Sequence, residues 1–313
     1  MPELRWLDLT ALLYDRTSAS CMAVAEALQP GSPDRLTRRR QGAGSGHTRL
    51  DLACRTLWVW ERGDRMRADP VIPQPFATTI AGLAWVFSRQ ERQPVYGFAL
   101  VLRVWTPGTL RVPLGRRLWQ QDGPSPAVLA LEWLSDARHR LRCRPESVRL
   151  DAWDPSKARL KRLRDSGWYV GCRLKQNRRC HGQAVRACRR HPYGADRGRL
   201  SGGLNVWVVR YGAKYDATNR LRLPTAEVRR RYRFRSQSAE VIRVCQAQRR
   251  LTGGQARAER APLHHIACCL IACCVLERER QARQRSIDHL KRQRSFRGRS
   301  SVLPALERLR STA

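Results

Sequence analysis

The chain has 313 residues, with 61 Lys and Arg against 26 Asp and Glu, which gives a formal net charge of +35. An excess of this size attracts polyanions over long range and binds them by releasing counterions, so it favours a nucleic-acid partner. A bias toward arginine codons would also contribute to it. No stretch of about 20 uncharged apolar residues is present, so we expect no membrane span. Eleven cysteines without a Cys-x-x-Cys pair, and a first segment without a secretory pattern, predict reduced thiols in a cytoplasmic protein.

The segment 1–62 is predicted to be a small helical module. Helical periodicity covers Leu7–Leu28 and returns at His47–Glu61, and the Pro-, Gly- and Arg-rich Pro30–Gly46 between them is typical of a linker. We expect this module to contact DNA or to mediate dimerisation. A helical cap without either role would have the same pattern.

Residues 63–175 have the pattern of an α/β domain. Strands are predicted at Gly82–Ser88, Tyr96–Trp105, Leu110–Trp119, Ser147–Asp151 and Gly167–Leu174, and helices at Ser125–Arg142 and Pro155–Asp165. The first three strands are expected to form an antiparallel meander. The strand–helix–strand spacing that follows them predicts a parallel crossover.

The remaining residues divide into three parts. The segment 176–223 is interpreted as a basic, β-rich insertion, 224–280 as C-terminal helices at Thr225–Gln246 and Ala261–Arg280, and 281–313 as a basic tail. The second of these helices contains His264 and His265 close to four cysteines. We interpret it as a buried core helix, because structural zinc sites usually use Cys-x-x-Cys knuckles on turns.

Three acidic residues in this framework are typical of a metal-dependent nuclease. Asp69 and Asp151 each end a strand-like run, and Glu240 lies on the helix that begins at Thr225. Two magnesium ions bridged by carboxylates activate a water and stabilise the leaving oxygen in phosphodiester cleavage. Each acid has a structural alternative: a turn for Asp69, a helix N-cap for Asp151, and an ion pair with a neighbouring arginine for Glu240.

Four segments together resemble the insertion-sequence transposases of the DDE superfamily, in the branch with a Tyr-x2-Arg-x3-Glu-x6-Lys signature. They are ADPVIPQPF, VRLDAWDPSKARLKRLRDSGWYVGCRLKQNR, YRFRSQSAEVIRVCQ and LTGGQARAERAPLHHIACCLIACCVLERER. The resemblance implies an α/β fold with a ribonuclease H-like mixed sheet flanked by helices. It also implies magnesium (Mg2+) as cofactor, cutting and joining of DNA, and double-stranded DNA partners, namely the inverted repeats of the element and its target. A homodimer on DNA and a bacterial, nucleoid-associated location are further expectations.

Carried over by position, the resemblance assigns catalysis and metal binding to Asp69 and Asp151, and binding of the DNA end to Tyr232 and Arg235. The glutamate expected four residues after Arg235 is Ala239, and Glu240 follows one residue later. Gln246 stands where the signature has Lys, and Ala68 and Pro70 also depart from the first motif. One residue on a helix is a rotation of about 100°, so Glu240 should point away from the site. We therefore expect weak or no strand transfer.

The insertion offers a second DNA-binding candidate. Its basic residues include Arg178, Arg179, Arg189 and Arg190, and they alternate with Tyr193 and Trp207, as in grooves that track a nucleic-acid backbone. A solvated basic surface is the alternative.

Three functions therefore remain open: an impaired transposase, a non-catalytic DNA-binding remnant of one, and a basic globular protein whose acids are structural. The first two require Asp69 and Asp151 to meet on adjacent strands. Two arginines in predicted strands, Arg103 and Arg149, must reach solvent or find a partner, because an unpaired buried charge costs several kcal/mol.

Overall fold

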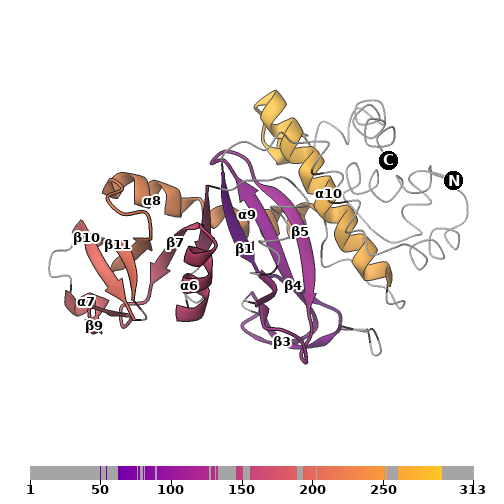
Figure 1. The fold of residues 1–313 in the computed structure, drawn as a ribbon. Coiled ribbons are helices and arrows are strands. Elements are labelled where there is room, and N and C mark those ends of the chain that lie inside the picture. Colours follow the sequence, from indigo (N-terminus) through magenta and orange to yellow (C-terminus); the bar gives the residue numbers. More distant parts are fainter. Residues whose placement is uncertain are drawn as a thin grey trace, which may run out of the picture.

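The computed structural model describes Leu50, Cys54 and the residues 63–75, 77, 80, 82–88, 90–126, 128–130, 132, 146–150, 156–188, 193–201, 203–249, 251 and 260–290. The predicted helical module 1–62, apart from two residues, lies outside this part of the chain, as do Asp151, Arg189 and Arg190. Figure 1 shows a large twisted sheet with helices on both faces.

Five strands form the centre of the sheet in the order β5-β4-β1-β6-β7. They are β1 (Asp64–Ala68), β4 (Gln93–Thr106), β5 (Val112–Trp119), β6 (Ser147–Leu150) and β7 (Tyr169–Leu174). Strand β4 is antiparallel to both β5 and β1, whereas β1–β6 and β6–β7 are parallel. The predicted crossover is confirmed, since α6 (Lys157–Asp165) connects β6 to β7 and begins at the N-cap Ser156.

Two short strands, β2 (Val71–Pro73) and β3 (Ala84–Ser88), pair antiparallel with the first half of β4. The predicted meander of β3, β4 and β5 is not formed. Strand β3 pairs with the first half of β4 and β5 with its second half, both on the edge opposite β2, so β4 does not lie between them. Gly97 lets β2 approach closely, because a Cβ on it would lie 2.3 Å from the carbonyl oxygen of Ile72.

The basic segment after β7 prolongs the same sheet. Its strands follow β7 in the order β12 (Lys214–Thr218), β11 (Leu204–Tyr211), β10 (Tyr193–Leu200), β8 (Arg179–Cys180) and β9 (Gln183–Ala184), with the short helix α7 (Val185–Cys188) at the end. The described strands thus form one sheet of twelve.

The two faces of the centre are covered by different helices. Met66 and Ala68 of β1 belong to a core shared with α9 (Ser236–Arg249) and α10 (Arg260–Arg283). Val148 and Leu150 of β6 belong to a second core with α6. Val148 is the register partner of Arg65, so the two side chains lie on the same face of the sheet. The side chain of Met66, the next residue, points to the other face, so α6 covers the face opposite to that covered by α9 and α10. None of the helices in the described ranges combines the length and apolar composition of a membrane span.

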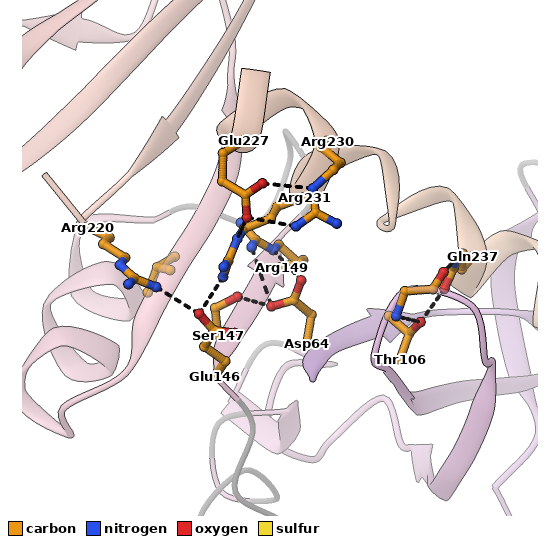
Figure 2. Close-up of polar contacts among 12 residues, drawn as sticks. Asp64, Thr106, Glu146, Ser147, Arg149, Arg220, Glu227, Arg230, Arg231 and Gln237 are labelled. Carbon is orange, nitrogen blue, oxygen red and sulfur yellow. Dashed lines mark hydrogen bonds and ion pairs between the residues drawn. The ribbon is translucent and has the colours of Figure 1, made fainter. Parts of the chain in front are cut away.

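The helix predicted from Thr225 to Gln246 is broken into α8 (Thr225–Arg233) and α9 by Phe234 and Arg235. The last turn of α8 tightens, with the Phe234 amide donating to the Arg231 carbonyl at 3.2 Å. At the start of α9, Gln237 is held by the turn after β4: it accepts a hydrogen bond from Thr106 and donates one to the Gly108 carbonyl (Figure 2). Helical periodicity cannot reveal this break, because the contacts that cause it are tertiary.

A buried ion pair lies where the two parallel strands begin. The side chain of Arg149 on β6 is 3 % exposed, and its Nε lies 3.3 Å from Oδ2 of Asp64 on β1. Burial lowers the pKa of Arg149, and the charge of Asp64 opposes that effect. Gly171 on β7 leaves room for the guanidinium, since a Cβ there would lie 1.9 Å from Nη1. Arg149 therefore finds the partner that its strand position required, and Arg103 is buried on β4.

Further ion pairs connect this end of the sheet to α8 (Figure 2). Glu146, directly before β6, accepts hydrogen bonds from Arg220 and Arg231, each at 2.7 Å. Arg231 also pairs with Glu227 in the first turn of α8. Arg230 lowers the pKa of Glu227 to about 2, against a smaller opposing effect of burial and with help from Arg231. The position of α8, and of the chain that leads into α9, thus depends on charged side chains.

The substitution Asp64→Ala is expected to lower the free energy of unfolding by about 3–5 kcal/mol, because it leaves Arg149 buried without its counter-charge. Urea denaturation checks this. Asp165→Ala is the matched control: it breaks the exposed pair with Arg164 and should cost at most about 1 kcal/mol. Equal losses in the two variants would contradict a special role for the buried pair.

Stability should also fall in acid through Glu227. Its folded-state pKa lies below the ordinary value, so its contribution is complete above the ordinary carboxyl range and is lost as the pH falls toward about 2. We expect Glu227→Gln to flatten the pH dependence of the free energy of unfolding in that window. Glu91→Gln, in the exposed turn after β3, is the control and should leave the curve of the native chain unchanged.

Candidate functional site

A cavity of about 580 Å³ lies between the end of β1 and helix α9. Its wall on the strand side is formed by residues 67–71, by 86–88 of β3 and by 99–101 of β4, and Trp119 and Pro126 also line it. Arg235 and the α9 residues Ser238, Ala239, Ile242, Arg243 and Gln246 form the helical wall.

Asp69 reaches the cavity from an interruption between two strands. It follows β1, and Pro70 then precedes β2, yet both strands keep one register with β4: Ala68 pairs with Leu102 and Val71 with Ala99. The amide of Leu100 donates to the Pro70 carbonyl at 2.9 Å. The pairing with β4 therefore loses only the hydrogen bond that an amide N–H at position 70 would donate, which proline lacks. The Asp69 side chain is 42 % exposed and accepts a hydrogen bond from Nε of Arg67 at 3.0 Å.

The parallel strand β6 runs beside β1 and ends at Leu150, directly before Asp151 in the sequence. Carboxyl ends of adjacent parallel strands lie at one edge of a sheet. Asp151 itself lies outside the described residues, so its distance from Asp69 stays a prediction.

Helix α9 turns one face to the cavity. Arg235, Ala239, Ile242 and Gln246 recur at three- or four-residue spacing, as residues on one side of a helix do. Ala239 is exposed there, so the position that the resemblance assigns to the third acid opens into the cavity and carries a methyl group.

Glu240 does not line the cavity. Its Oε1 lies 2.6 Å from Arg243 and 3.2 Å from Arg111. The hydrogen bond from Arg243 lowers the pKa of Glu240, burial acts in the opposite direction, and Arg111 adds a further lowering. The side chain is therefore an ion-paired glutamate on the neighbouring face of α9, which is the structural alternative that its sequence position left open.

The other predicted DNA-binding residues that the structure describes, Tyr232, Arg178 and Arg179, are not part of the cavity wall. Tyr232 of α8 stacks under the guanidinium of Arg173, 4.4 Å from the ring centroid, and is not part of the cavity wall. Arg178 and the exposed Arg179 precede and begin β8, four strands beyond β7 in the sheet. The structure thus brings Asp69 and Arg235 together and separates them from Tyr232 and the insertion.

The charge of the cavity is the opposite of that of a metal site. Among its described lining residues, Asp69 is the single carboxylate, against the arginines Arg67, Arg235 and Arg243. No group of three or more metal-ligating side chains occurs in the described ranges. A magnesium pair requires several oxygen ligands, so these residues do not fit it, and the forked donors of arginine fit phosphate oxygens.

Three lining residues were missed by the sequence reasoning. Arg67 shares a strand face with Asp69 because it is two residues away, and Arg243 follows Ala239 by one helical turn. Strand and helix periodicity could therefore have predicted that both residues lie near the site. Phe87 was assigned to a strand without a role. The alternation of Trp85 and Phe87 in AWVFS was the available signal, but alternation alone does not say which face is exposed.

No family model matches this sequence, and a search of curated proteins found no match. Among solved structures, the chain is similar to one described as a cryo-EM structure of piggyBac transposase synaptic complex with hairpin DNA. The TM-score is 0.56 at 9 % sequence identity, over 94 % of this chain and 70 % of that chain. At this identity the similarity concerns the fold, and the described mixed sheet with its helices is therefore transposase-like.

Proposed function

We propose that this chain is a DDE transposase by descent, from an insertion sequence, which binds the DNA ends of its element and cleaves them weakly or not at all. The observation that supports this best is the convergence of Asp69, Arg235 and Ala239 on one cavity. Asp69 lies more than 160 residues before Arg235 and Ala239 in the sequence, and the resemblance assigns all three positions to one site.

The strand order supports the proposed ancestry. In our interpretation β5-β4-β1-β6-β7 is a ribonuclease H-like sheet, in which Asp69 follows the central strand and Asp151 follows its parallel neighbour. The similar solved structure is that of a transposase synaptic complex with hairpin DNA, which is consistent with DNA as the partner of this fold.

The electrostatics support binding more than cleavage. Arg67, Arg235 and Arg243 line the cavity together with one described carboxylate, and Nη1 of Arg235 donates to the Ser238 hydroxyl at 3.2 Å. Arginines at a cavity wall can provide charge-assisted hydrogen bonds to phosphate. In a chain with a net charge of +35 they would add to a large nonspecific attraction for duplex DNA.

We propose that the chain acts as a homodimer on that DNA.

The helical wall of the cavity supports the proposed impairment. Helix α9 presents Ala239 where the proposed ancestor had its third acid, and Glu240 is held by two arginines outside the cavity. The second candidate function, a non-catalytic remnant that occupies element ends, is favoured by the same geometry and by the pairing of Asp69 with Arg67.

Arg235→Ala is expected to weaken binding to a duplex carrying the element's inverted repeat by about tenfold or more, because hydrogen bonds to charged groups contribute about 1.5–3 kcal/mol. The slope of log affinity against log salt concentration should fall by about 1, as for one lost phosphate contact. Fluorescence anisotropy at several salt concentrations measures both. Arg164→Ala, on the exposed side of α6, is the control, and an equal loss there would indicate nonspecific attraction only.

Ala239→Glu, alone or with Gln246→Lys, is expected to raise nicking of that duplex in magnesium or manganese well above the wild-type rate, because the exposed position 239 has room for the longer side chain. Ser236→Glu adds a glutamate to α9 outside the cavity and should have no effect. Glu240→Ala should also leave the wild-type rate unchanged. Wild-type nicking as fast as that of Ala239→Glu would exclude impairment, and binding without nicking in Ala239→Glu would favour the remnant.

A further inference from the structure

Beyond the described cavity, we infer that Trp85 and Phe87 form a stacking platform for unpaired nucleobases of the DNA strand whose phosphates enter that cavity. This inference rests on the proposed function, since it specifies the state of the DNA at the same site. Neither residue belongs to the motifs that carry the family resemblance.

The two aromatic side chains are unusually exposed for their size. Trp85 is 70 % and Phe87 61 % exposed, and both lie on β3 with one residue between them. Side chains two apart on a strand point to the same side, so their rings share one surface. Trp85 is also paired in register with Tyr96 of β4, and their ring centroids lie 5.7 Å apart.

This surface adjoins the arginines. Phe87 lines the cavity together with its strand neighbours Val86 and Ser88, and the opposite wall contains Arg235 and Arg243. Among the described strands β3 pairs with β4 alone, so its other edge has no strand partner in that part of the chain. A strand of DNA crossing from the cavity onto β3 would therefore place phosphates on arginines and bases on aromatic rings, the combination by which proteins hold single strands.

Charge decides the occupant. Without DNA to neutralise it, a second copy of this chain would bring the same net charge of +35 to the surface and would be repelled, whereas a nucleic acid is attracted to it. Bases within a duplex are stacked on one another and do not offer their faces to a protein ring. The platform therefore fits bases that are unpaired, such as those exposed at a nicked or frayed DNA end.

The test compares a labelled single strand of about 12 nucleotides, within the range of known single-strand sites, with its own duplex. We expect Trp85→Ala and Phe87→Ala each to lower single-strand affinity about five- to hundredfold, because stacking is sequence-tolerant and strong. Duplex affinity should change by less than about twofold, and the salt dependence should not change, because no phosphate contact is removed. Trp85→Phe should restore binding.

Leu221→Ala, which truncates another exposed apolar side chain, is the control and should leave both affinities unchanged. Single-strand affinity that does not depend on Trp85 would overturn the platform while leaving the proposed function intact. Equal losses on both DNAs, or loss of self-association in place of loss of DNA binding, would also overturn it. A wild-type protein that binds neither DNA would instead refute the proposed function.

Discussion

The buried contact between Arg149 and Asp64 is the constraint on which the rest of the fold depends. It joins β6 to β1 at the start of the two parallel strands, 85 residues apart in the sequence, and Gly171 of β7 makes room for it. A charge removed from water in this way is tolerated only with its partner in place. The same end of the sheet holds α8 through Glu146 and Arg231, so one set of ion pairs fixes both the parallel strands and the approach to α9.

The cavity at the other end of β1 has a different electrostatic character. Its arginines outnumber its carboxylate, and Asp69 is already paired. Positive charge of this kind favours phosphate, whereas cations held over a scissile bond need several carboxylates. Under the proposed function, binding and cleavage would have separated in this chain, because the cavity keeps its arginines while position 239, where the resemblance expects the third acid, carries alanine.

Sequence periodicity was sufficient for the elements that obey it. The strands β4, β5 and β7 and the apolar helix α10 were predicted from alternation and from helical spacing, and the rotation between Ala239 and Glu240 followed from helix geometry. The break at Phe234 was missed because Gln237 is held by Thr106 and Gly108, which lie about 130 residues earlier. The partner of Arg149 and the exposure of Trp85 were equally inaccessible, since both depend on which segments lie side by side rather than on local pattern.

The anchoring of Gln237 has an evolutionary consequence. It fixes the orientation of α9 from outside the cavity, so the backbone at position 239 does not depend on the side chain carried there. Under the proposed ancestry, replacement of the acid at that position leaves the scaffold unchanged, and two of the four alanine codons become glutamate codons by one nucleotide change. A gene with such a codon would regain the acidic side chain by a single mutation, at a backbone position that the replacement did not alter.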